Sequence, residues 1–317
     1  MKKVVLLSIF LAMIVIVLGT YTRLTDASLG CPDWPSCYGH LSISKNIEII
    51  DMPEQAFSER PFEKPQAWNE MLYQYVAGAL GFLILVIFIN CLFSKDYNKP
   101  VKLPFFLVLL VCLQAAVGMW TAAQNLTSAE VTSHLLVGCT LLSGLFLLYL
   151  RLTPYRIPGG DVGLRRFGKY SILGIIILTV QIALGGWTSA NYASLACTEL
   201  PTCKGTWHER LDFTGAFSIP SAKSHEFGVH DYIHRMGALF TFLYVCWFSI
   251  TLYVSASSNL IKKLSVIMVL VLGVQITLGI SNVVYSLPIA IAVMHNIVAA
   301  YLMMVLVTIS YTLYRKT

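Results

Sequence analysis

Charged residues are scarce in this sequence. Only 12% of its 317 residues are Asp, Glu, Lys or Arg, whereas 56% are hydrophobic, and the mean hydropathy is +0.70. Soluble domains carry about 25% charged residues, so the composition excludes an ordinary soluble protein. It indicates a protein whose surface faces the lipid bilayer.

The scarcity of charge leaves long apolar runs. A helix needs roughly 20 apolar residues to cross a bilayer. Eight runs are long enough: 4–21, 71–93, 103–122, 131–150, 170–189, 230–254, 261–280 and 289–312. The sequence therefore predicts an all-α membrane protein with eight transmembrane helices.

Two common sequence signals are missing. No A-x-A cleavage site follows the first run, whose apolar part exceeds the roughly 7–15 residues typical of a signal peptide, so we expect 4–21 to remain as a helix. No Rossmann fingerprint is present either, since "GGDVG" at 159–163 follows no strand. A dinucleotide cofactor bound in that way is not expected.

Basic residues are distributed unevenly along the chain. Fourteen of the 22 Lys and Arg residues fall in segments predicted on the same side of the membrane as the N-terminus. The short loops near 123–130 and 281–288, on the other side, hold none. Because Lys and Arg concentrate in cytoplasmic loops, both termini are predicted to lie in the cytoplasm. The net charge of +6 follows from this topology, and we expect no nucleic-acid partner.

The two halves of the chain are similar to each other. Residues 14–40, moved forward by 166, match 180–206 at 11 of 27 positions. Further along the chain the two halves align with a shift of 161 residues, which aligns Gln114 with Gln275 and His134 with His295. The sequence thus predicts two tandem four-helix bundles related by a pseudo-twofold axis along the membrane normal.

We place the N-terminal bundle at 1–150, a cytoplasmic linker at 151–169 and the C-terminal bundle at 170–317. Each half contains two cysteines six residues apart, Cys31 with Cys37 and Cys197 with Cys203. Both loops are predicted on the outer face, where oxidation is favoured. Each pair could form a structural disulfide or a redox-responsive thiol pair, and the spacing alone leaves both open.

Three histidines fall about one turn into even-numbered helices, at one predicted depth: His134, His234 and His295. Ionisable side chains inside a membrane span indicate function. His234 and His295 belong to the same bundle, where two imidazoles can serve as axial ligands of haem iron. Arg235 is a candidate contact for the haem propionates. Small residues nearby are expected to give a flat macrocycle room, namely Gly185, Gly186, Gly237, Ala238 and Gly279.

The first half departs from this pattern. Tyr73 and Gln74 occupy the positions that match His234 and Arg235. Glu70 precedes Tyr73 by three residues, on the same helix face. A carboxylate there is costly unless it is paired or functional.

These residues resemble motifs of the haem A synthase family. The resemblance covers essentially the whole chain, and its strongest motifs are "GTYTRLTDASLGCPDWPSCYGH", "NYASLACTELPTCKG", "IHRMGAL", "VTSHLLVG" and "AVMHNIVAA". It implies an oxidoreductase that converts the C8 methyl group of haem O into a formyl group by successive hydroxylation, giving haem A. It also implies haem b on His234 and His295, and substrate haem near Glu70 and His134.

The resemblance further implies a location and partners. The expected location is the bacterial plasma (inner) membrane. The expected partners are haem O synthase as donor and the terminal oxidase assembly machinery, and a homo-oligomer is compatible with the sequence.

Where the family has His-Arg, this chain has Tyr73-Gln74. Either His134 alone holds the substrate iron, with Tyr73 as a weak second partner, or the activity is altered. Two other functions stay open: a b-type cytochrome for electron transfer, and a non-catalytic haem-binding assembly factor.

Overall fold

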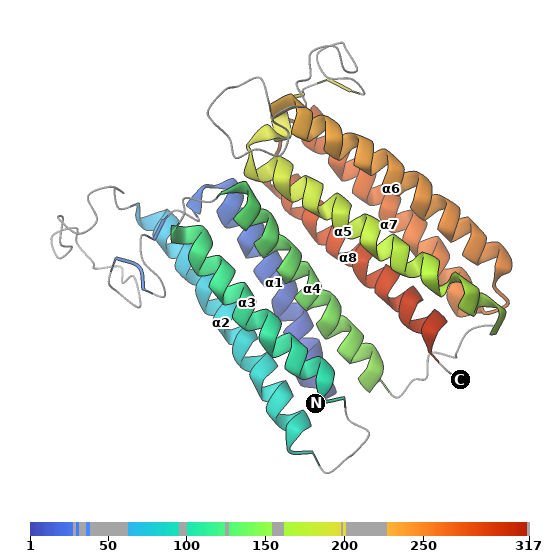
Figure 1. Cartoon of the computed structure of the whole chain (residues 1–317). Helices are drawn as coiled ribbons and strands as arrows, with labels where there is room; N and C mark the ends of the chain where they lie inside the picture. The colour runs from blue at the N-terminus through green and yellow to red at the C-terminus, as the bar shows by residue number, and fades with distance from the viewer. Residues whose placement is uncertain are drawn as a thin grey trace. The chain divides into compact units, whose positions relative to one another are not determined.

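The computed structural model describes residues 1–27, 30–31, 36–38, 63–94, 100–123, 127–153, 162–197, 199–200 and 227–315. The helices of these segments are α1 (Lys2–Leu24), α2 (Lys64–Leu92), α3 (Lys102–Ala123), α4 (Ser128–Leu152), η3 (Val162–Phe167), α5 (Gly168–Ala190), η4 (Ala193–Leu195), α6 (Phe227–Ser255), α7 (Asn259–Val284) and α8 (Ile289–Tyr314) (Figure 1). Eight of them, α1 to α8, are long and apolar enough to cross a membrane. The predicted all-α membrane fold is confirmed.

The chain forms two compact units, Met1–Leu142 (unit 1) and Ser143–Thr317 (unit 2). The boundary between them falls within α4, which runs from Ser128 to Leu152. The pseudo-twofold relation and the domain limits given above stay predictions.

In unit 1, α2 packs against both α1 and α3. The buried residues of α2 include Leu80, Ile84, Ile87 and Cys91, which recur every three or four positions and therefore form one stripe along the helix. α2 also begins earlier than its apolar run, at Lys64, with Pro65 in its first turn where a missing N–H is tolerated. These additional turns carry Glu70 into the helix.

Unit 2 contains a closed four-helix bundle. α5 packs against α6 and α8, and α7 packs against α6 and α8. α6 and α8 therefore lie diagonally across the bundle. Its core includes Phe248, Leu252, Met268, Leu302 and Leu306, all buried.

Candidate functional site

Each predicted histidine ring contacts the helix that precedes its own. On α4, His134 accepts a hydrogen bond at its carbonyl oxygen from Gln114 Nε2 of α3, at 3.1 Å. Gly118 of α3 lies against the imidazole, since a Cβ added there would be 3.2 Å from His134 Cε1. A glutamine and a glycine one turn later thus fix the position of His134.

A related arrangement recurs in unit 2, where the glutamine contacts the ring of His295. Gln275 Nε2 of α7 is 3.1 Å from His295 Nε2, and a Cβ at Gly279 would be 3.2 Å from His295 Cε1. Gln181 and Gly185 of α5 flank His234, as the next paragraph describes.

Gln181 makes two contacts with His234. Its Nε2 donates to the His234 carbonyl oxygen at 3.0 Å and lies 3.1 Å from the ring nitrogen Nδ1. A Cβ at Gly185 would lie 3.0 Å from His234 Cε1. The role of Gln181 was not predicted from the sequence. The signal that could have revealed it is a Gln-x-x-x-Gly spacing that recurs on α3, α5 and α7.

Three of the small residues near the histidines lie against side chains of the bundle, and the room they were expected to give a macrocycle stays a prediction. The rings of His234 and His295 take up the room at Gly185 and Gly279, and the Gln181 side chain takes up the room at Gly237. Gly185 and Gly279 therefore let the histidine rings pack closely against the preceding helix, and Gly237 lets the Gln181 side chain pack closely against α6.

The first helix pair is the exception to the glutamine pattern. Gly19 of α1 lies against Tyr73 of α2, with a built Cβ 3.2 Å from Tyr73 Cε2. The position one turn before Gly19 is Val15 rather than glutamine. Tyr73 therefore occupies the place that a histidine ring has in the other helix pairs. Its preceding helix, α1, supplies no glutamine amide at the position of Val15.

The structure brings Tyr73 and His134 together. Tyr73 Oη lies 2.9 Å from His134 Nε2, so the two side chains share a hydrogen bond between α2 and α4. Glu70, one turn before Tyr73, accepts a hydrogen bond from Gln74 Nε2 at 3.2 Å. The three predicted site residues of the first half therefore gather within unit 1.

His234 and His295 come from the diagonal helices α6 and α8. Both rings are half-buried. A diagonal pair of imidazoles in a bundle interior is the arrangement that binds a metalloporphyrin between facing helices.

Arg235 follows His234 and has several partners. It forms an ion pair with Asp231, with 2.8 Å between Nη2 and Oδ2, and both side chains are largely buried. Its guanidinium also donates to the carbonyl oxygens of Cys197 and Glu199. These contacts attach α6 to the segment that follows η4. The propionate contact suggested for Arg235 stays a prediction.

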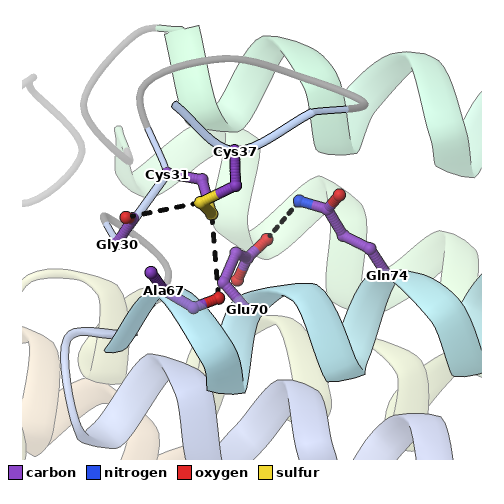
Figure 2. Close-up of a disulfide and its surroundings, with 6 residues drawn as sticks. All are labelled: Gly30, Cys31, Cys37, Ala67, Glu70 and Gln74. Carbon is purple, nitrogen blue, oxygen red and sulfur yellow. Dashed lines mark hydrogen bonds between the residues drawn. A yellow bond between two sulfur atoms is a disulfide. The ribbon is translucent and has the colours of Figure 1, made fainter. Parts of the chain in front are cut away.

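The predicted disulfide of the first half is confirmed. Cys31 and Cys37 are bonded at 2.02 Å and form a buried cluster with Ala67 and Met71 of α2. Figure 2 shows the disulfide over the turn of α2 that carries Ala67 and Glu70. In the second half Cys197 is buried, whereas Cys203 lies outside the described residues, so that pairing stays a prediction.

Gly30 lets the disulfide segment approach α2. A Cβ at Gly30 would lie 2.7 Å from the carbonyl carbon of Gln66 and 2.8 Å from the nitrogen of Ala67. Because both atoms belong to helix backbone, they cannot yield as a side chain would.

Gly30→Ala is therefore expected to displace this segment and leave free thiols at Cys31 and Cys37. Maleimide labelling of the denatured, unreduced protein measures them. Gly78→Ala is the control, because a Cβ there meets nothing within 4 Å. Equal labelling of the two variants would contradict the role assigned to Gly30.

Fold and site together define a class. The chain is a helical membrane protein in which unit 1 contains the hydrogen-bonded Tyr73 and His134, and unit 2 contains His234 and His295 on the diagonal helices α6 and α8. Imidazole and tyrosine are both axial ligands of haem iron in proteins.

Comparison with known proteins identifies the family. Residues 2–307 match the model of the COX15-CtaA family, described as cytochrome oxidase assembly protein, and the chain belongs to this family. The chain is 44% identical to a "Heme A synthase" of Shewanella oneidensis, over 98% of the chain and 96% of that relative. It is also 23% identical to proteins of the same name from Chelativorans sp. (90% of the chain, 83% of the relative) and Rickettsia prowazekii (95% and 94%).

Proposed function

We propose that the chain is a haem A synthase, which oxidises the C8 methyl group of haem O to a formyl group. The observation that carries this proposal is the presence of two unlike ligand pairs, one per unit. The pair in unit 2 has two imidazoles, and the carboxylate one turn before His234, Asp231, forms an ion pair with Arg235. The pair in unit 1 is Tyr73 with His134, and the carboxylate one turn before Tyr73, Glu70, has the neutral Gln74 as its partner. The similarity to the Shewanella oneidensis relative over nearly the full length of both chains supports the same activity.

His234 and His295 fit a resident haem b. Within the described part of the chain, Nδ1 of His295 is buried without a hydrogen-bond partner, and His234 lies across the bundle from it. These two imidazoles would hold the haem iron. When bound there, haem b supplies one-electron transfer, which carboxylates and imidazoles cannot supply.

A glycine substitution tests this assignment. Gly185→Ala would place a Cβ 3.0 Å from His234 Cε1, while Gln181 holds the same residue at 3.0 and 3.1 Å. We expect the ring to shift and haem affinity to fall roughly 5-fold, which corresponds to about 1 kcal/mol. Titration with haem, followed by the low-spin absorbance, measures the change. Gly273→Ala, where a Cβ meets nothing within 4 Å, should bind haem normally, and equal affinities for both variants would contradict the assignment.

In unit 1, His134 is the proposed ligand of the substrate iron. Glu70 lies on the same helix as Tyr73, with its Oε1 held by Gln74. A carboxylate at this position can accept or donate a proton and can stabilise positive charge that develops at the substrate methyl group. Conversion of a methyl group to a formyl group removes four electrons. Two successive hydroxylations account for them, because the second gives a hydrate that loses water.

Location and partners follow from this function. The eight apolar helices make the chain a multi-pass membrane protein, and we place it in the bacterial plasma membrane with both termini in the cytoplasm. The donor of haem O would be haem O synthase, and the product would pass to the terminal oxidase assembly machinery.

One experiment tests the proposal against its main alternative. The chain is expressed with a source of haem O, and the extracted haems are separated by chromatography and identified by mass. Haem A or its hydroxylated precursor supports the synthase. A b-type cytochrome is the second candidate, favoured by the direct hydrogen bond between Tyr73 and His134. It would yield haem B and unchanged haem O only.

A further inference from the structure

The two ends of unit 2 carry opposite kinds of charge. Within the described residues its carboxylates are Glu199 and Asp231, which belong to the end where η4 lies and α6 begins. At the other end α5 begins beside the last turn of α8, since a Cβ added at Gly168 would lie 2.8 Å from Tyr314 Cζ (Figure 1). The basic side chains at this second end, which we call the basic end, are Arg165, Arg166, Lys169, Lys262, Lys263 and Arg315.

The short helix η3 packs against the bundle at the basic end. It contacts α5, α6 and α8. Leu164 and Phe167 of η3 are buried in the core of unit 2, whereas Arg165 and Arg166 are exposed. Apolar side chains therefore attach η3 to the bundle and leave its two arginines at the surface, as in a helix that lies in a membrane interface.

Aromatic rings accompany the cations of the basic end. The distances from the charged group to the ring centroid are 4.9 Å for Arg166 over Phe167, 5.1 Å for Lys169 over Tyr170, 5.9 Å for Lys262 over Tyr253 and 5.7 Å for Arg315 over Tyr311. A ring attracts and orients a cation but accepts none of its charge, so the N–H groups can still donate to an anion. The basic end is thus ordered without being neutralised.

The same aromatic residues indicate the depth of the basic end in the bilayer. Tyr170 packs against Trp247 of α6, with 5.6 Å between ring centroids, and both Trp247 and Tyr253 are exposed. Exposed Trp and Tyr side chains concentrate at the level of the lipid headgroups. We therefore expect the cations beside these rings to lie at the level of the lipid phosphates.

Arg315 adds an independent observation. Its Nη1 is buried without a hydrogen-bond partner within the described part of the chain. A buried donor without a partner costs free energy, and more so when the group is charged. Phosphate oxygens are acceptors that match the planar guanidinium group.

We propose that the basic end of unit 2 binds the headgroup of an anionic phospholipid of the phosphatidylglycerol class. Arg315 and the two arginines of η3 donate to the phosphate oxygens, and the acyl chains lie along exposed apolar residues of α6 such as Ile250 and Val254. A zwitterionic lipid is disfavoured because its ammonium group would meet the same cations. The inference does not depend on the proposed function, since it requires only a membrane-embedded chain.

The test is native mass spectrometry of the purified full chain in detergent, titrated with dioleoylphosphatidylglycerol or dioleoylphosphatidylcholine. The anionic lipid should bind at least ~10-fold more tightly. Near a membrane surface each Lys or Arg strengthens binding of anionic lipid roughly 5-fold. Arg315→Gln should therefore weaken binding of the anionic lipid by about that factor, and the double variant Arg165→Gln/Arg166→Gln by roughly 25-fold. Binding of the zwitterionic lipid should stay unchanged in both.

The double variant Lys2→Gln/Lys3→Gln is the matched control. It also removes two exposed charges, but from the start of α1 in unit 1. Its affinity for the anionic lipid should stay within about twofold of wild type. Thermal unfolding of each variant reports whether the fold is kept.

Four results would overturn the inference. They are equal affinity of the wild type for both lipids, unchanged affinity in the arginine variants, an equal loss in the lysine control, and displacement of the anionic lipid by inorganic phosphate at the same concentration. The last result would identify a site for a free anion instead of a lipid. A chain that makes no haem A but binds the anionic lipid as described would reject the proposed function and leave the lipid site standing.

Discussion

Glu70→Gln is expected to stop haem A formation while the protein keeps its low-spin haem spectrum. Glutamine preserves the length of the side chain and an oxygen that can accept the bond from Gln74, which is 3.2 Å in the wild type. It removes the negative charge and the exchangeable proton. Loss of a positioned acid or base costs about 10²- to 10⁴-fold in rate, so haem A should fall at least ~100-fold when the extracted haems are quantified.

Glu130→Gln is the matched control. Glu130 precedes His134 by one turn, but its Oε2 accepts a hydrogen bond from the Thr127 backbone N–H at 3.2 Å and thereby caps α4. We expect this variant to make haem A at the wild-type rate within about twofold, since a cap contributes only ~1 kcal/mol to stability. Normal product from Glu70→Gln, or an equal loss in Glu130→Gln, would show that Glu70 has no specific chemical role.

His234→Ala and His295→Ala are each expected to eliminate the low-spin b-type spectrum. If these two imidazoles hold haem b as proposed, removal of either would leave the haem with one protein ligand, and the low-spin state would be lost. Absorbance and electron paramagnetic resonance of the purified variants measure the loss. Haem A formation should fall with it, because haem b is the electron relay in the proposed function.

His230→Ala tests whether the effect is specific. His230 lies one turn before His234 on α6, and its ring packs edge-on against Trp187 at 6.4 Å between centroids. The low-spin spectrum should survive in this variant. An intact spectrum in His234→Ala or His295→Ala would dismiss the assigned ligands, and its loss in His230→Ala would indicate a general disturbance of α6.

The helices were largely predictable from the sequence because lipid permits only long apolar segments. Their ends were not. The run at 71–93 corresponds to a helix that starts at Lys64, because backbone hydrogen bonds continue into polar turns that hydropathy does not mark. Glu70 lies just before the apolar run, and its predicted place on the same helix face as Tyr73 agrees with the observed extent of α2.

The site was predictable in part. The internal repeat identified His134, His234 and His295 and the matching Tyr73, since chemistry-bearing residues at equivalent positions stand out in apolar helices. The contact between Tyr73 and His134, and the use of glutamines to hold the rings, depend on which helix faces meet. A single sequence does not contain that information, because spacing along one helix says nothing about the rotation of its neighbour.

The glutamine and glycine contacts have a consequence for how the protein is made. Gln114, Gln181 and Gln275 all act on the helix that directly follows their own in the chain. Each pair of consecutive helices can therefore orient its own histidine as soon as both have entered the bilayer during synthesis. A nascent chain released after α6 would already present His234 in its mature orientation, whereas the proposed second ligand, His295, would enter the bilayer only with α8.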